Sequence, residues 1–107
     1  MINWPHVREL KQEVGEDGFE EVIELFLEEV EEVIEKLATD DRSQLAQDLH
    51  FLKGSALNLG FQDFSTKCLE GERLAASGKS GDVNLSGIIG CYAQSKAAFL
   101  SEVTSKA

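Results

Sequence analysis

A long amphipathic segment near the start of the chain is the feature that most constrains its fold. Between residues 17 and 37, apolar residues recur every three or four positions for about five turns, and acidic residues fill the positions between them. The apolar positions are Phe19, Val22, Ile23, Phe26, Leu27, Val30, Val33, Ile34 and Leu37. A helix with one apolar face must bury that face against other elements, so this segment predicts a packed helical domain.

Similar periodicity predicts four more helices and no strand. Gly71 lies in the apolar stripe of the fourth helix, which predicts the close approach of a neighbouring helix. We expect a first helix from Trp4 to Val14 and a second that begins at Asp17 with an Asp17–Glu20 capping box. The third helix is expected to have the same kind of box at Asp41–Gln44 and a C-terminal cap at Gly60. A fourth helix should end near Gly78, and a loop over 77–84 should lead to a last helix capped by Asn84.

These elements predict the architecture. A chain of 107 residues suits one domain, which we expect to cover residues 1–107. Four long amphipathic helices joined by short loops predict an all-α, antiparallel four-helix bundle, with the short N-terminal helix capping one end. One bundle can bury all of these apolar stripes, so we expect a monomer.

Charge and composition exclude several classes of protein. The net charge of −10 argues against partners such as nucleic acid or an anionic membrane surface, because both attract basic proteins. No apolar run approaches the ~20 residues of a membrane span, and the first residues, MINWPHVREL, do not resemble a signal peptide. We therefore expect a cytoplasmic protein. Cys68 and Cys91 match no zinc-binding or CxxC spacing, so we expect both to be reduced, in or near the core.

The third helix carries a histidine on the wrong side for a core residue. On a helical wheel, Leu45, Leu49, Leu52, Ala56 and Leu59 form one face, and His50 lies across from most of them. Lys53, Gly54 and Leu57 share the surface of His50, within about 60° of it, and Ala46 lies one turn earlier. Leu57 and Phe61 are predicted to form an apolar rim that a partner covers.

This arrangement indicates a histidine that receives a phosphoryl group from another protein. A neutral imidazole is a good nucleophile, Gly54 leaves room for a large reactant, and Lys53 can meet negative charge on the ring. Metal binding fits poorly, because His6 is the only other histidine in the chain and no HExxH pair is present.

The run HFLKGSA at residues 50–56, closed by Gly60, resembles the signature of histidine-containing phosphotransfer (HPt) domains. The acidic amphipathic helix before it and the segment FQDFSTKCLEGERLA after it agree with that family, so the resemblance covers nearly the whole chain. It implies a four-helix bundle that acts in a multistep two-component phosphorelay.

The resemblance also implies roles for partners and residues. Phosphate would pass from an aspartate on one receiver domain, such as that of a hybrid sensor histidine kinase, through this chain to another response-regulator receiver. His50 would be the phosphoacceptor, Lys53 would stabilise the phosphate, Gly54 would give access, and Ser55 would order the site or the interhelical contact. Receivers supply the Mg²⁺, so no cofactor or metal of the chain's own is implied.

One position departs from the family pattern. Many members carry a glutamine 22 residues after the histidine, where this chain has Glu72. A carboxylate there would repel a phosphate unless it turned away or met a cation such as Arg73 or Lys53. We therefore place Glu72 only as a neighbour of His50.

Two other functions stay open at the level of sequence. An adaptor bundle would bind receivers without accepting phosphate, although relatives of that kind lose the histidine that this chain keeps. An enzyme would use His50 as a general base, but no nucleophile elbow and no paired acid supports it. No P-loop is present either, so we do not expect a kinase.

Overall fold

The computed structural model describes residues 2–107, and its regular elements are helices, with no strand in this range beyond one isolated bridge between Ile2 and Phe61. The first helix has the predicted bounds, and the loop over 77–84 contains a short 3₁₀ helix. The elements are α1 (Trp4–Val14), α2 (Glu16–Ala38), α3 (Leu45–Leu59), α4 (Gln62–Ala76), η1 (Ser80–Asp82) and α5 (Leu85–Lys106).

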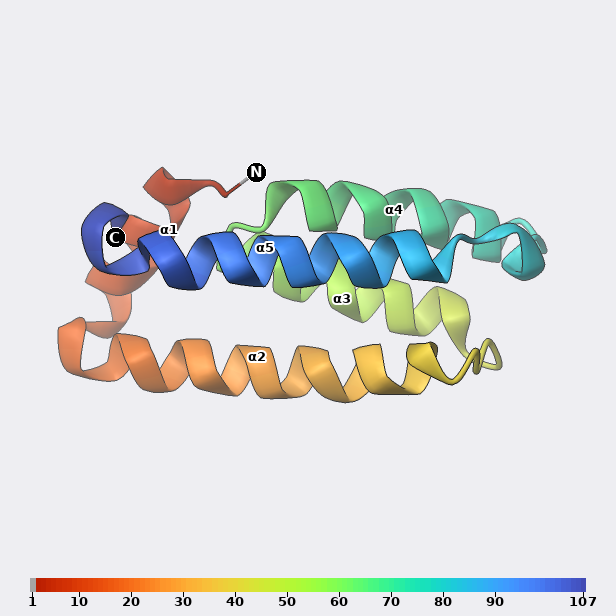
Figure 1. The fold of residues 1–107 in the computed structure, drawn as a ribbon, viewed down its shortest axis with the longest axis horizontal. Helices are drawn as coiled ribbons and strands as arrows, with labels where there is room; N and C mark the ends of the chain where they lie inside the picture. The colour runs from red at the N-terminus through yellow and green to blue at the C-terminus, as the bar shows by residue number, and fades with distance from the viewer. Residues whose placement is uncertain (1) are drawn as a thin grey trace.

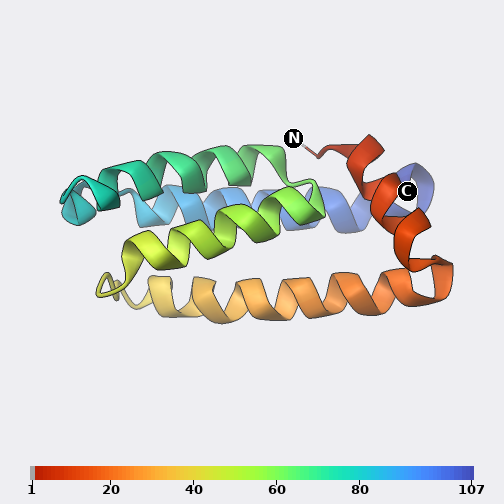
Figure 2. The same cartoon turned by 180° about the vertical axis from the view of Figure 1, so that it is seen from behind.

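The four longer helices lie side by side along an elongated molecule of 42 × 21 × 21 Å (Figure 1). Helix α3 contacts α2 and α4, and α5 contacts α4 and α2, so the four helices form a closed ring. Successive helices run in opposite directions, and the view from behind shows α3 in front of α5 (Figure 2). The pairs α3–α4 and α2–α5 therefore form opposite sides of the molecule.

Helix α1 lies across one end of this ring, beside the C-terminus (Figure 1). The Trp4 ring stacks on Phe99 of α5, with centroids 5.6 Å apart. The Asn3 amide donates to the carbonyl of Gly60 over 2.7 Å, which ties α1 to the turn between α3 and α4. Gly60 takes a left-handed conformation (φ 78°) as the C-terminal cap of α3, as predicted.

Aromatic and aliphatic side chains from all five α-helices or their caps fill the core. Phe61, Phe64 and Phe99 are buried, and Phe61 lies between the rings of Tyr92 and Phe99. The buried positions of α2 follow the predicted stripe and are Phe19, Ile23, Leu27, Val30 and Leu37. The 3.6-residue periodicity therefore identified the core face of this helix correctly.

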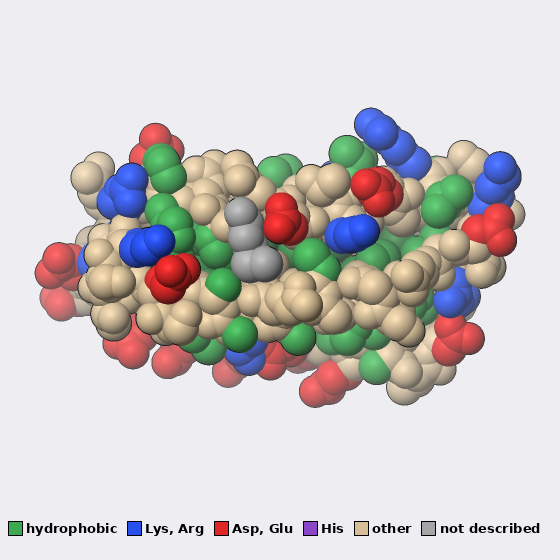
Figure 3. Space-filling view, turned by 45° about the horizontal axis from the view of Figure 1, so that its top comes forward, with side chains coloured by type: hydrophobic (Ala, Val, Ile, Leu, Met, Phe, Trp, Pro, Cys, Tyr) green, Lys and Arg blue, Asp and Glu red, His purple; other side chains and the backbone are tan. Residues whose placement is uncertain are grey.

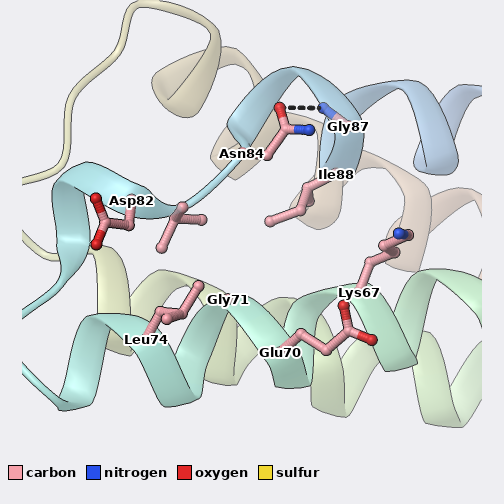
Figure 4. Close-up of a pocket in the computed structure, with 9 residues that line it drawn as sticks. Lys67, Glu70, Gly71, Leu74, Asp82, Asn84, Gly87 and Ile88 are labelled. Atoms are coloured by element: carbon pink, nitrogen blue, oxygen red, sulfur yellow. Dashed lines mark hydrogen bonds between the residues drawn. The ribbon is translucent and has the colours of Figure 1, made fainter.

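The predicted close approach at Gly71 is confirmed. A Cβ atom at this position would lie 2.8 Å from Leu49 Cδ1 and 3.1 Å from Ile88 Cδ1. Figure 4 shows Gly71 on α4 facing the start of α5. The same view shows the predicted cap of α5, in which the Gly87 amide donates to Asn84 Oδ1 over 3.1 Å.

Two predicted capping boxes are wrong. Helix α2 begins at Glu16, because Gly15 (φ 80°) turns the chain sharply enough to end α1 and start α2 by itself. Helix α3 begins at Leu45 without a side-chain cap. Asp41 Oδ1 instead accepts from the amide and the hydroxyl of Ser43, a local turn that competes with capping.

Candidate functional site

His50 stands on the outer surface of α3, as its helical phase predicted. Its side chain is 70% exposed, whereas Leu49 and Leu52 on either side of it are fully buried. One turn further on, a Cβ atom built on Gly54 meets no atom within 4 Å. The ring therefore lies beside open space, where another protein can reach it.

Glu72 of α4 joins His50 to Lys53. Its Oε2 lies 2.8 Å from His50 Nδ1, and its Oε1 accepts a hydrogen bond from Lys53 Nζ over 2.7 Å. The side chains of Lys53 and Glu72 are only 22% and 21% exposed, so this pair is partly sheltered from water. The cation that meets Glu72 is thus Lys53, one of the two that the sequence suggested, and not Arg73.

The sequence did not predict this bridge, because it depends on how α3 packs against α4. His50 and Glu72 are 22 residues apart, on different helices. A signal was available in the motif: Lys53 and His50 lie on one face of α3, and a carboxylate from a neighbouring helix can reach both. Glu72 therefore contacts both His50 and Lys53, whereas the sequence placed it only as a neighbour of His50.

The charges of the site are arranged so that Glu72 is ionised. The hydrogen bond from Lys53 lowers the pKa of the Glu72 carboxyl, and burial partly opposes this. The contact with His50 lowers the pKa further. An ionised carboxylate accepts hydrogen bonds and donates none, so His50 Nδ1 must carry the ring proton in this contact. The lone pair of the neutral ring is then on Nε2.

Two exposed apolar side chains flank the histidine on α3. Leu57 is 56% exposed, as predicted, and Phe51 is 39% exposed. Sequence analysis missed Phe51, although its position on the helical wheel, outside the core stripe of α3, could have identified it. Together with His50 and Gly54, these residues form a surface that is apolar around one reactive ring.

Other predicted site residues lie elsewhere. Phe61 is fully buried among core aromatics, so the prediction that it forms an accessible rim is wrong. It is the N-cap residue that precedes α4, and the tight turn at Gly60 directs its ring inward. Ser55 is buried (7% exposed), which favours an interhelical position over contact with the ring. Ala46, one turn before His50, is half-buried and small.

Burial raises the pKa of both cysteine thiols, so neither is activated as a nucleophile. Both cysteines are free, and burial raises the pKa of the Cys68 thiol to about 12.

Among residues 2–107, no cluster of three or more His, Cys, Asp or Glu side chains could hold a metal ion. None of the helices described is long and apolar enough to cross a membrane.

An exposed histidine on a helical domain, held at one ring nitrogen and open at the other, is consistent with a class of phosphoryl-accepting helical proteins. Comparison with family models agrees with this class: the Hpt domain model matches residues 21–91, which include the whole His50 site. The chain therefore belongs to the Hpt domain family, whose members take part in two-component phosphorelays. No curated protein and no solved structure gave a significant match.

Proposed function

We propose that this chain is an antiparallel four-helix-bundle phosphotransfer protein in which His50 accepts a phosphoryl group from one receiver aspartate and passes it to another. The observation that carries the proposal is the bond between Glu72 and His50 Nδ1, because it leaves Nε2 as the exposed nucleophile. Lys53 and Gly54 are proposed to stabilise the phosphate and to give it access.

The proposed step balances without a proton leaving the ring. The Nε2 lone pair attacks phosphorus, a new N–P bond forms, and the P–O bond to the donor aspartate breaks so that its carboxylate leaves. The phosphorylated ring keeps its proton on Nδ1 and gains positive charge, which the Glu72 carboxylate at 2.8 Å offsets. Transfer to the second aspartate is the reverse reaction, so the same groups serve both steps.

In the proposed step, Glu72 would not repel the phosphate. Its carboxylate contacts the Nδ1 side of the ring, whereas the phosphate would be on the Nε2 side. Its second oxygen is neutralised by Lys53. Glu72 is thereby proposed as a positioning residue for His50.

The proposed partners are receiver domains, one of them on a hybrid sensor histidine kinase. They would bring the aspartate and the Mg²⁺, so the chain would need no cofactor and no ATP site of its own. Phe51, Gly54 and Leu57 would lie under the docked receiver, because they surround His50 on α3. A shallow apolar surface around a central reactive group suits a transient partner. We propose that the chain acts as a monomer.

Incubation with a phosphorylated receiver domain tests the function. Wild-type protein should gain acid-labile phosphate, and His50→Gln should gain none while its circular dichroism shows unchanged helicity. Phosphate retained by His50→Gln would contradict the assignment of the site. Phosphate incorporated from ATP by the isolated chain would contradict the absence of kinase activity.

A further inference from the structure

A groove follows the seam between α2 and α5 on the side of the molecule opposite the α3–α4 pair. It consists of two adjoining hollows of about 430 and 440 Å³. Leu100 lines both hollows, so they adjoin along the two helices. We call them together the α2–α5 groove. Figure 1 shows these two helices running side by side along the molecule.

The walls of the groove differ in character. Its apolar surface includes Ile23, Ile34 and Val103, together with Leu100, which is 50% exposed. On the α5 side the wall is low, because Ala93 and Ala97 have small side chains. Adjoining hollows with apolar floors and one low wall can accept the apolar face of a third helix.

The α2 side of the groove is acidic. Four glutamates lie along it and form no ion pair or hydrogen bond through their side chains within residues 2–107: Glu16, Glu20, Glu24 and Glu35. Glu31, between them, is instead bound to Tyr92 and Lys96 of α5. Figure 3 shows acidic side chains along the lower long edge of the molecule, the side on which α2 lies in Figure 1. Lys11 of α1 also lines the first hollow, over the Phe19 ring, but three of the glutamates line that hollow too. Positive charge on an occupant would therefore complement this row.

The groove is separate from the phosphotransfer site. His50 and Glu72 belong to α3 and α4, which form the opposite side of the molecule from α2 and α5. A protein bound in the α2–α5 groove would therefore leave the His50 surface open.

We propose that the α2–α5 groove docks a basic amphipathic α-helix of a partner protein, with apolar anchors spaced three or four residues apart. Charge favours this occupant over a second copy of the chain, because two copies carrying −10 each repel one another. The same charge opposes binding to an anionic membrane. Such docking would hold the chain near a partner while His50 remains free to exchange phosphate. Binding in the groove does not require His50 to be a phosphoacceptor.

A pair of synthetic helical peptides serves as the probe. Both carry leucines at i, i+4, i+7 and i+11, and their other positions are mostly lysine in one peptide and mostly glutamate in the other. Titration of ¹⁵N-labelled protein with the lysine peptide should shift amide signals of the α2–α5 groove, and the glutamate peptide should shift none. Shifts confined to α3 and α4, or no saturable shift at all, would overturn the proposal. So would the same shifts on concentrating the chain alone, because they would indicate self-association.

Matched variants separate docking from general charge attraction. Glu20→Lys with Glu24→Lys should weaken binding of the lysine peptide about tenfold, whereas Glu21→Lys with Glu28→Lys, on the same helix but outside the groove, should change it less than about twofold. Leu100→Ala should weaken binding, and Leu25→Ala, at an equally exposed leucine outside the groove, should not. Equal losses within either pair would overturn the proposal. Phosphate uptake at His50 should be unchanged in all four variants.

Discussion

Glu72 Oε2 and His50 Nδ1 lie 2.8 Å apart and join α4 to α3 at the one exposed histidine of the α3 surface. The contact leaves Nε2 of the ring free. The other carboxylate oxygen of Glu72, Oε1, accepts a hydrogen bond from Lys53. The position at which many members of the family carry a glutamine thus carries a charged residue that still binds the ring. Its consequences can be tested separately from phosphotransfer.

The state of the His50 ring should depend on Glu72. In wild-type protein at neutral pH, ¹⁵N NMR should find the neutral ring protonated on Nδ1, because the ionised carboxylate can only accept. In Glu72→Ala, both tautomers should be populated and phosphate uptake should slow. Glu72→Gln retains an acceptor oxygen and should keep part of the effect. An identical tautomer in wild type and Glu72→Ala would contradict the positioning role, even if phosphotransfer itself were confirmed.

Lys53 should affect the phosphate rather than the fold. Lys53→Ala should slow transfer, or shorten the lifetime of phosphohistidine, by about tenfold, because one charge-assisted donor near the developing charge is lost. Circular dichroism should show unchanged helicity, because the substitution removes a side-chain pair and no backbone contact. Lys67→Ala, at an exposed lysine of α4, is the control and should behave as wild type. Unchanged rate and lifetime in Lys53→Ala would remove the proposed role.

Small and large residues at position 54 should have different effects: a small one should stabilise the fold, and a large one should slow phosphotransfer. Gly54→Ala should stabilise the protein by about 1 kcal/mol, because alanine favours helix and the site is open. Gly54→Gln should slow transfer by about 10-fold to 100-fold, since its side chain keeps the receiver from the reacting distance. Gly90→Gln, at an equally open glycine of α5, provides the control. Normal transfer by Gly54→Gln would show that access is not limited there.

Gly71 should respond to alanine in the opposite sense from Gly54. A Cβ atom would lie 2.8 Å from Leu49 and 3.1 Å from Ile88, so the packed side chains must shift. Overpacking of this kind costs about 1–3 kcal/mol, and the gain in helix propensity returns about 1 kcal/mol. We therefore expect a net loss of about 1 kcal/mol in Gly71→Ala, measured by urea unfolding. Stabilisation equal to that of Gly54→Ala would mean that α4 and α5 are less tightly packed than the structure shows.

The Glu31 cluster predicts a loss of stability in acid. The hydrogen bond from Lys96, followed by that from Tyr92, lowers the pKa of Glu31 below its ordinary 4.5. A carboxyl whose pKa is lower in the folded state stabilises the fold above its unfolded value, and this contribution disappears as pH falls through the folded value. The stability difference between wild type and Glu31→Gln should thus be constant from about pH 7 to pH 5 and shrink below about pH 4.

Glu35→Gln tests whether that effect is specific to the cluster. Glu35 lies one turn further along α2 and forms no side-chain ion pair within residues 2–107. Its stability relative to wild type should vary little over the same pH range. If the stability of both variants relative to wild type changed in the same way with pH, the loss of stability in acid would be due to overall charge and not to the hydrogen bonds of Glu31 between α2 and α5.

Local patterns predicted much of this protein because they depend only on nearby residues. The apolar periodicity identified the helices, and Gly60 and Asn84 were recognised as caps because their chemistry acts within one turn. The phase of α3 alone put His50 on the outside and Gly54 beside it. The capping boxes failed where another local solution was available, at Gly15 and at Asp41.

Helical periodicity was enough to predict which side chains lie on which face of each helix, and so the exposure of His50 and the family to which the chain belongs. The packing of the helices was needed to show that Glu72 binds both His50 and Lys53, that Phe61 is buried, and that α2 and α5 leave a groove between them. The physical reason is that periodicity sets direction around a helix axis, whereas contacts between helices depend on their relative rotation and spacing, which the packing of the whole core sets.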